Sequence, residues 1–176
     1  PGIPVAVPGL HGVAEIDAGL VHTAVRTTDG EVLSWGGADL GEIGDGSPLR
    51  RAVPTRAAIA GAGSISVSSS ATCARLGSGE TRCWGALPSA ADGSAGAPMP
   101  FPTPLGVPTA DPLCVSVDLG TRAVALGPDG SVWQWGTVIQ NGLAAAPVAP
   151  PTRVPLGPAR DLVSGESFTC AALADG

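Results

Sequence analysis

The sequence contains no lysine, and all nine of its basic residues are arginines. Acidic residues number 15, which gives a formal net charge of −6. Surfaces that bind nucleic acid or anionic membranes need clustered positive charge. Arg50–Arg51 is the sole adjacent basic pair, and we interpret it as part of a solvated loop. The charge balance therefore argues against a nucleic-acid partner.

Helical patterns and long apolar runs are also missing. The chain has 26 glycines and 18 prolines, and aromatic residues make up 3% of it. Leu143–Ala149 comes nearest to a helical segment, but Pro147, Pro150 and Pro151 interrupt it. No apolar run approaches the roughly 18 residues that a membrane-spanning helix needs. We therefore expect an all-β protein without a membrane span.

A phrase that recurs at a period of about fifty residues gives the organisation of the chain. It reads DGEVLSWG at Asp29–Gly36, SGETRCWG at Ser78–Gly85 and DGSVWQWG at Asp129–Gly136. Asp175–Gly176 opens it once more. Proline-led connectors separate the copies, so we divide the chain into approximate units 4–53, 54–101, 102–150 and 151–176. These units are expected to form one propeller domain over residues 1–176 that is incomplete at its trailing end.

Each unit is predicted to contain three or four short antiparallel strands. Asp-Gly is a tight-turn signal, so in the first unit Val21–Thr27 and Glu31–Trp35 should form a hairpin. A fourth strand is expected near the proline-led connector, at Arg56–Ile59. Repeated sheets of this size are typical of propeller blades, whereas a β-sandwich lacks the self-similarity and a parallel β-helix has a shorter period. The strands expected before the hairpins are Val13–Asp17, Ser64–Ser68, Leu113–Val117 and Asp161–Val163.

The first unit resembles the regulator of chromosome condensation repeat. It carries the Gly-x-x-His segment, the DG-x-V-x-x-WG hairpin and a GQLGDG-like loop at Gly41–Gly46. The resemblance, which is greatest to bacterial members with cysteines on both hairpin arms, implies a seven-bladed ring. At fifty residues per blade, the chain would supply three to three and a half blades, and an isolated part should be marginal or associate. The structural positions implied by the repeat are Gly19, His22, Asp29, Gly30, Trp35, Gly36, Trp84, Gly85, Asp129, Gly130, Trp135 and Gly136.

The cysteine spacing predicts one disulfide. Cys73 and Cys83 each lie five residues from Ser78, the centre of the second hairpin, so they should face each other across it. The alternative is a pair of reduced thiols packed as small apolar groups. Cys170 matches Cys73, and its expected partner lies beyond Gly176; Cys114 is either a buried thiol or bridged to another blade. A disulfide in a repeat protein indicates an oxidising compartment, so we expect an extracellular or cell-surface location.

No catalytic, cofactor or metal site is predicted. We interpret His22 as a structural residue and His11 as solvated, and no serine nucleophile can be singled out to act with them. Glu42 and Asp45 are interpreted as turn residues rather than an acid–base pair. The cysteines lack the spacing of a zinc site.

Three of the four tryptophans occupy matching positions and should pack in the core. Trp133 has no counterpart in the other copies, and we treat it as a candidate contact residue. The main hypothesis is a non-enzymatic module for protein interaction or surface display, with contacts from the insertions Ala38–Arg51, Ala86–Met99 and Thr137–Pro150. The alternatives are a propeller inhibitor of a secreted enzyme and part of an enzyme whose site lies in other blades. The identity of the protein partner cannot be read from the sequence, and the other blades of the parent chain are themselves expected neighbours.

Overall fold

The structure is a computed structural model that describes residues 2–89, 97–110, 115–118, 122–140, 143–164 and 168–175. Within these ranges the regular elements are all strands, arranged in three four-stranded antiparallel sheets and one two-stranded sheet. The first sheet contains β1 (Val13–Ala18), β2 (His22–Thr27), β3 (Val32–Gly36) and β4 (Arg51–Arg56); the second contains β5 (Ala62–Val67), β6 (Ala71–Leu76), β7 (Thr81–Ala86) and β8 (Pro98–Pro104). The third contains β9 (Val115–Asp118), β10 (Arg122–Leu126), β11 (Val132–Gln140) and β12 (Leu143–Arg153); the fourth contains β13 (Ala159–Ser164) and β14 (Thr169–Leu173).

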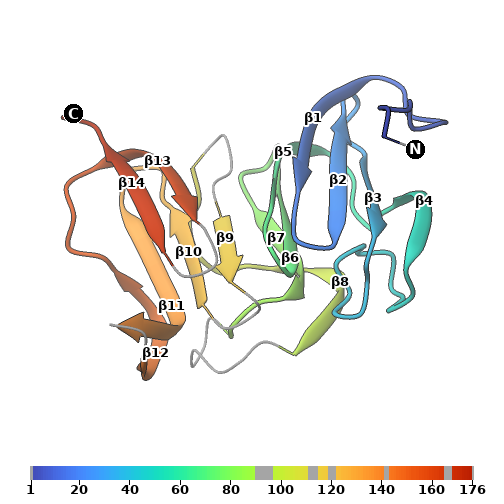
Figure 1. Cartoon of the computed structure of the whole chain (residues 1–176). Coiled ribbons are helices and arrows are strands. Elements are labelled where there is room, and N and C mark those ends of the chain that lie inside the picture. The colour runs from blue at the N-terminus through green and yellow to red at the C-terminus, as the bar shows by residue number, and fades with distance from the viewer. Residues whose placement is uncertain are drawn as a thin grey trace.

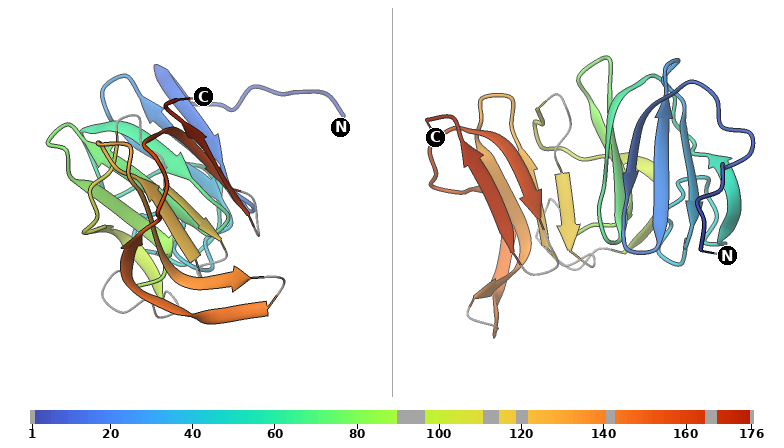
Figure 2. Two further views of the ribbon diagram at one scale, coloured as in Figure 1. Left: turned by 90° about the vertical axis from the view of Figure 1, so that its left-hand side faces the viewer. Right: turned by 45° about the horizontal axis from the view of Figure 1, so that its top comes forward.

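The four sheets are fanned side by side in chain order (Figure 1). Within each sheet every strand pairs with the next strand along the chain. The first strands of successive sheets are neighbours, because β1 contacts β5, β5 contacts β9, and β9 contacts β13. The two further views in Figure 2 show the same radial arrangement. The molecule is thus a partial β-propeller, as predicted, and we call its sheets blades one to four.

The same three-residue turn closes the hairpin of each of the first three blades. In blade one the Thr27 amide donates to the Glu31 carbonyl, and the Gly30 amide donates back to the Thr27 carbonyl. The third turn residue must have a positive φ, and glycine adopts it at 81° in Gly30, 90° in Gly79 and 77° in Gly130. The glycine of the recurring phrase is therefore required by the backbone of the turn.

The glycine after each recurring tryptophan has a different task. The pairing between the third and fourth strands shifts register next to Gly36, Gly85 and Gly136, and all three have positive φ. A Cβ on Gly85 would lie 2.3 Å from the Ser70 carbonyl oxygen, and one on Gly36 would lie 2.4 Å from that of Val21. The Trp-Gly pair thus marks a β-bulge where two backbones come close.

One prediction about strand position is wrong: the fourth strand of blade one lies near the proline-led connector, as expected, but spans Arg51–Arg56 rather than Arg56–Ile59. It begins where Arg51 pairs with Gly36, next to a β-bulge between Ser34 and Gly36. The third insertion, for which no local structure was predicted, lies within β11 and β12, where Thr137 pairs with Pro147 and Ile139 with Ala144. The ends of these two strands extend beyond the rest of the sheets in Figure 2.

The core lies between blades rather than within them. Three clusters of buried apolar side chains fill the interfaces between blades one and two, two and three, and three and four. Trp84 and Trp135 are fully buried in the first and second interfaces. The outer faces of the end blades carry exposed apolar side chains, including Ile16 on β1 and Val163 on β13.

Candidate interaction surface

The first blade interface is organised around the indole of Trp84. This side chain projects from β7 of blade two toward blade one, where its Nε1 donates to the Glu42 carbonyl over 2.9 Å. The loop Gly41–Gly46 of blade one lies over the ring, and a Cβ on Gly44 would come within 2.6 Å of it. The GQLGDG-like loop is therefore an inter-blade contact whose glycine makes room for the tryptophan of the next blade.

A buried polar chain reinforces the same interface. The Thr72 hydroxyl donates to the Glu42 carbonyl at 3.2 Å, so its oxygen must accept from His22 Nε2, which lies 2.7 Å away. This places the proton of the neutral imidazole on Nε2. His22 Nδ1 is buried without a hydrogen-bond partner, and a Cβ on Gly19 would lie 3.1 Å from it. Gly19 and His22 thus belong to one closely packed structural unit.

Burial lowers the pKa of His22 from its ordinary value of 6.5 to about 4. The imidazole is 3% exposed, and its protonation would place a charge where no described group can accept a bond from Nδ1. His22 is consequently neutral at physiological pH, as a structural histidine should be. The exposed His11 has no comparable environment.

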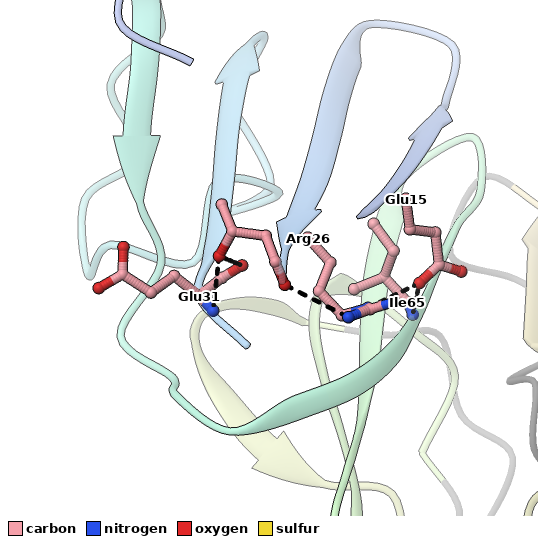
Figure 3. Close-up of polar contacts among 5 residues, drawn as sticks. Glu15, Arg26, Glu31 and Ile65 are labelled. Atoms are coloured by element: carbon pink, nitrogen blue, oxygen red, sulfur yellow. Dashed lines mark hydrogen bonds and ion pairs between the residues drawn. The ribbon is translucent and has the colours of Figure 1, made fainter. Parts of the chain in front are cut away.

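Two carboxylates of β1 bond to the backbone of blade two. Glu15 Oε2 accepts from the Ile65 amide at 3.1 Å and from Arg26 Nε at 3.0 Å, as Figure 3 shows. Asp17 Oδ2 accepts from the Val67 amide at 2.6 Å. These bonds satisfy backbone donors on the edge of β5, which would otherwise lack a strand partner on that side.

The second blade interface contains the predicted disulfide. Cys73 and Cys83 are directly opposed on β6 and β7 and are bonded to each other, which confirms the prediction. Both lie in the apolar cluster between blades two and three, where Trp135 Nε1 donates to the Pro88 carbonyl at 2.9 Å. Cys170 is a free, exposed thiol on β14, and Cys114 lies outside the described residues.

The predicted recognition insertion Ala38–Arg51 is only partly exposed. Ala38 and Gly41–Gly44 are buried, whereas Asp39 and Pro48–Arg50 are exposed. Glu42 Oε2 accepts from the Leu40 amide, and Asp45 accepts from the Ser47 amide and Arg51, so both acids serve the loop itself, as predicted. Part of the second insertion, Ala86–Met99, lies outside the described residues.

Two exposed apolar side chains lie on the two segments that form the contact between this insertion and blade two. Leu49 is 63% exposed and Phe101, on β8, is 57% exposed. The two segments are joined at Gly46, whose amide donates to the Pro100 carbonyl and whose Cβ position lies 2.5 Å from the Phe101 ring. We call Leu49, Phe101 and the exposed Arg50, which directly follows Leu49, the loop-tip surface.

Trp133 is less available than the sequence suggested. Its indole is half-buried against the cluster between blades two and three, and its Nε1 donates to the Ser131 hydroxyl at 2.9 Å.

No group of three or more metal-ligating side chains occurs in the described part of the chain. No described helix is long and apolar enough to cross a membrane.

Sequence reasoning missed Thr72, Glu15 and Asp17 as inter-blade residues. Alternation along β1 could have revealed the two acids, because Glu15 and Asp17 share one face of a strand. Thr72 carried no signal, since its bond depends on a backbone carbonyl 30 residues away.

Comparison with known structures supports the fold. Chains that this one resembles include yeast RCC1 (Prp20) in a complex with Kap60, with 16% identity, a TM-score of 0.76, and coverage of 97% of this chain and 44% of the other. Prp20p from Saccharomyces cerevisiae, in a study of its binding to Gsp1p and histones, gives 22% identity, a TM-score of 0.62, and coverage of 82% and 39%. Human WBSCR16 gives 21% identity, a TM-score of 0.62, and coverage of 81% and 38%. No protein-family profile matches the sequence.

The class defined by these findings is an all-β protein with the fold of a partial β-propeller. The structural neighbours are RCC1-like propellers, as the sequence resemblance implied. At these identities the likeness concerns the fold, and the chain spans about two fifths of the length of each neighbour.

Proposed function

We propose that this chain is part of a non-enzymatic propeller that binds a protein partner outside the cytoplasm, secreted or on a bacterial cell surface. The loop-tip surface is the observation that carries the proposal. Leu49 and Phe101 expose apolar side chains although the blades around them have a well-packed core. Apolar side chains with a neighbouring arginine are typical of the centre of a protein interface.

The frame and the insertions differ in the way that a binding scaffold requires. The hairpins of blades one to three have the same register, whereas their insertions form a packed loop in blade one and a strand extension in blade three. The fold neighbour RCC1 (Prp20) has been solved in a complex with another protein, Kap60. The disulfide supports the extracellular part of the proposal, because such bonds persist in oxidising compartments.

The binding test compares wild type with Leu49→Asp and Phe101→Asp. A partner is captured from the extracellular fraction of the source cells, purified, and titrated against each variant. Because a buried charge is costly at an interface, each substitution should weaken binding on the order of tenfold or more. Val5→Asp is the matched control, since Val5 is 77% exposed and lies away from the loop-tip surface in sequence. Equal affinities for all four proteins would contradict the proposal.

The location is tested separately by counting thiols in the protein isolated from cells with a thiol-blocking reagent. A Cys73–Cys83 bond present at the time of blocking is expected. Reduced Cys73 and Cys83 would remove the extracellular part of the proposal and leave the binding part standing.

A further inference from the structure

Proline protects the fourth strand of each of the first three blades from pairing with a further strand. In blade one the Ala57 amide donates to the Val32 carbonyl, so alternation along the chain directs the backbone groups of Pro54 away from β3. Proline has no amide proton, and an edge position that it occupies therefore offers no donor to another strand. The same position, directly before the threonine that pairs with the third strand, holds Pro54, Pro102 and Pro151.

Blade three has an additional edge, because its third and fourth strands continue past the bulge at Gly136. β10 pairs with β11 as far as Gly136, whereas β12 pairs with β11 as far as Gln140. We call this continuation, residues 137–140 and 143–147, the arm. It belongs to the part of β11 and β12 that extends beyond the other sheets in Figure 2.

The two edges of the arm differ in how they are protected. On the β12 edge Pro147 opposes Thr137, and the register shift between Thr137 and Ile139 places an extra residue in β12. Proline and bulges of this kind are the devices by which edge strands avoid pairing with other chains. The β11 edge has neither device past Gly136, and no strand in the described ranges pairs with that side of residues 138–140. The arm therefore has one protected edge and one open edge.

Alternation along β11 identifies the residue whose backbone groups the open edge presents. The Val132 carbonyl accepts from the Val154 amide, so the backbone groups of Val132 and of every second residue after it face the fourth strand. Those of Thr137 and Ile139 face the opposite side. The amide at the Thr137 position bonds within the blade in the first two copies, from Gly37 to Val21 and from Ala86 to Ser70. Ile139 therefore presents its amide and carbonyl at the open edge, and we call residues 138–140 the arm edge.

The arm carries no charge although the chain as a whole is acidic. The sequence has no charged residue between Asp129 and Arg153, whereas the formal net charge of the chain is −6. Asp129 and Arg153 themselves form an ion pair at 3.6 Å. Charged side chains are a common means of keeping exposed edge strands apart. The arm edge lacks them, so two copies can meet there without bringing like charges together.

We propose that the arm edge pairs with the arm edge of a second copy of this chain, which gives a two-fold antiparallel dimer. Ile139 of each copy lies opposite Ile139 of the other, and the two residues exchange their amide-to-carbonyl bonds. In this register Val138 lies opposite Gln140 of the second copy. Valine and isoleucine also favour the extended backbone that such pairing requires.

The arm edge itself determines the choice of a second copy as the occupant. A two-fold contact needs a strand that is compatible with its own reverse, and residues 138–140 contain neither a charge nor a proline that would oppose itself. The two arms run antiparallel, so the acidic bodies of the copies lie at opposite ends of the pair. A contact this short falls below the size of a standard interface, and we expect a reversible dimer. The inference does not depend on the loop-tip surface.

The test is sedimentation velocity over a concentration series that reaches about 1 mM. The parent protein carries Cys170→Ser, so that the exposed thiol cannot link two chains. It should show a reversible monomer–dimer equilibrium. Ile139→Lys and Ile139→Glu should each weaken dimerisation on the order of tenfold or more, because two-fold pairing sets like charges directly opposite each other. An equimolar mixture of the two variants should recover the dimer, since lysine then opposes glutamate.

Ile16→Lys is the matched control, because Ile16 is 65% exposed on β1, far from the arm in the chain. This variant should dimerise as the parent does, whereas its loss of association would place the contact on the end blade and overturn the proposal. Recovery in the mixture also shows that both Ile139 variants are folded. A parent protein that remains monomeric throughout the series would refute the dimer. A mixture that stays monomeric although the parent dimerises would refute the pairing of Ile139 with itself.

Discussion

The first and second blade interfaces share an indole slot but differ in what lies beside it. Trp84 and Trp135 are equally buried and make the same bond to a carbonyl of the preceding blade. In the first interface a histidine and a threonine add a buried hydrogen-bond chain.

In the second interface those two positions hold Ala71 and Ala123, and the Cys73–Cys83 disulfide lies in the apolar cluster instead. The repeat therefore determines where the blades meet, and individual substitutions determine what each interface responds to. The first interface should respond to pH and the second to reduction.

The largest effect should come from the feature that both interfaces share. Trp84→Ala and Trp135→Ala each leave a cavity the size of an indole and remove one hydrogen bond to a carbonyl of the preceding blade, so each should lower the free energy of unfolding by about 3–5 kcal/mol. Trp133→Ala is the control, because that indole is half-buried and bonds within its own hairpin. Denaturant titration of the three variants provides the measurement. If Trp133→Ala lowers the free energy of unfolding as much as the other two substitutions, the indole slot does not contribute more to stability than a half-buried tryptophan.

The disulfide should give the next largest effect. It closes a loop with a sequence separation of 10, and the chain-entropy model assigns about 3 kcal/mol to such a bond. Adding a reductant to wild type should lower the free energy of unfolding by this amount. The Cys73→Ala/Cys83→Ala variant should not respond to reductant, and Cys170→Ser should respond as wild type does. Insensitivity of wild type to reductant would mean that the blade interface, rather than the bond, holds this hairpin.

The pH response should come from the first interface. Because burial lowers the pKa of His22 to about 4, the unfolded chain binds more protons than the folded chain between about pH 4 and pH 6.5. The free energy of unfolding should therefore rise with pH across this window. Above about pH 6.5 His22 should contribute no further change. For the pKa values given, the His22 contribution should differ by about 2 kcal/mol between pH 5 and pH 7.

His22→Gln should remove this difference, and His11→Gln should leave it intact because His11 is exposed. Denaturant titrations at the two pH values measure both variants. The carboxylates also titrate toward the acid end, and comparison with His22→Gln subtracts their contribution. A pH dependence that is unchanged in His22→Gln would refute the assignment of the switch to the first interface.

The repeat made the blades predictable because it reports backbone requirements. Gly30 and Gly36 need positive φ, and Cys73 and Cys83 oppose each other by simple counting from the turn. The packing role of Trp84 and Trp135 followed from their matching positions, whereas Trp35, at the third matching position, is only half-buried. Such features depend on residues close in sequence, or on the period itself.

What could not be predicted depends on contacts between blades. The loop Gly41–Gly46 reads as an exposed insertion until the indole of the next blade is known to lie beneath it. The bounds predicted for the fourth strand of blade one were wrong because the register of Arg51–Arg56 depends on the bulge at Gly36. Thr72 acts on a carbonyl 30 residues away, and no local pattern contains that information.

The smallest of these effects should come from Thr72→Val, which keeps the shape of the side chain and removes its hydroxyl. His22 Nε2 then loses its acceptor, while the Glu42 carbonyl keeps the bond from Trp84. The cost should be about 1–2 kcal/mol, the penalty for one buried donor left unpaired. Thr23→Val is the matched control. Thr23 pairs with Trp35 in blade one as Thr72 pairs with Trp84 in blade two, but the histidine bond described above is made by Thr72. Denaturant titration should show a loss for Thr72→Val and almost none for Thr23→Val.

Because removal of its partner leaves His22 easier to expose, Thr72→Val should also show a smaller difference in the free energy of unfolding between pH 5 and pH 7. Equal losses in the two valine variants would mean that the indole slot alone holds the first interface together, and that the polar chain contributes nothing to it.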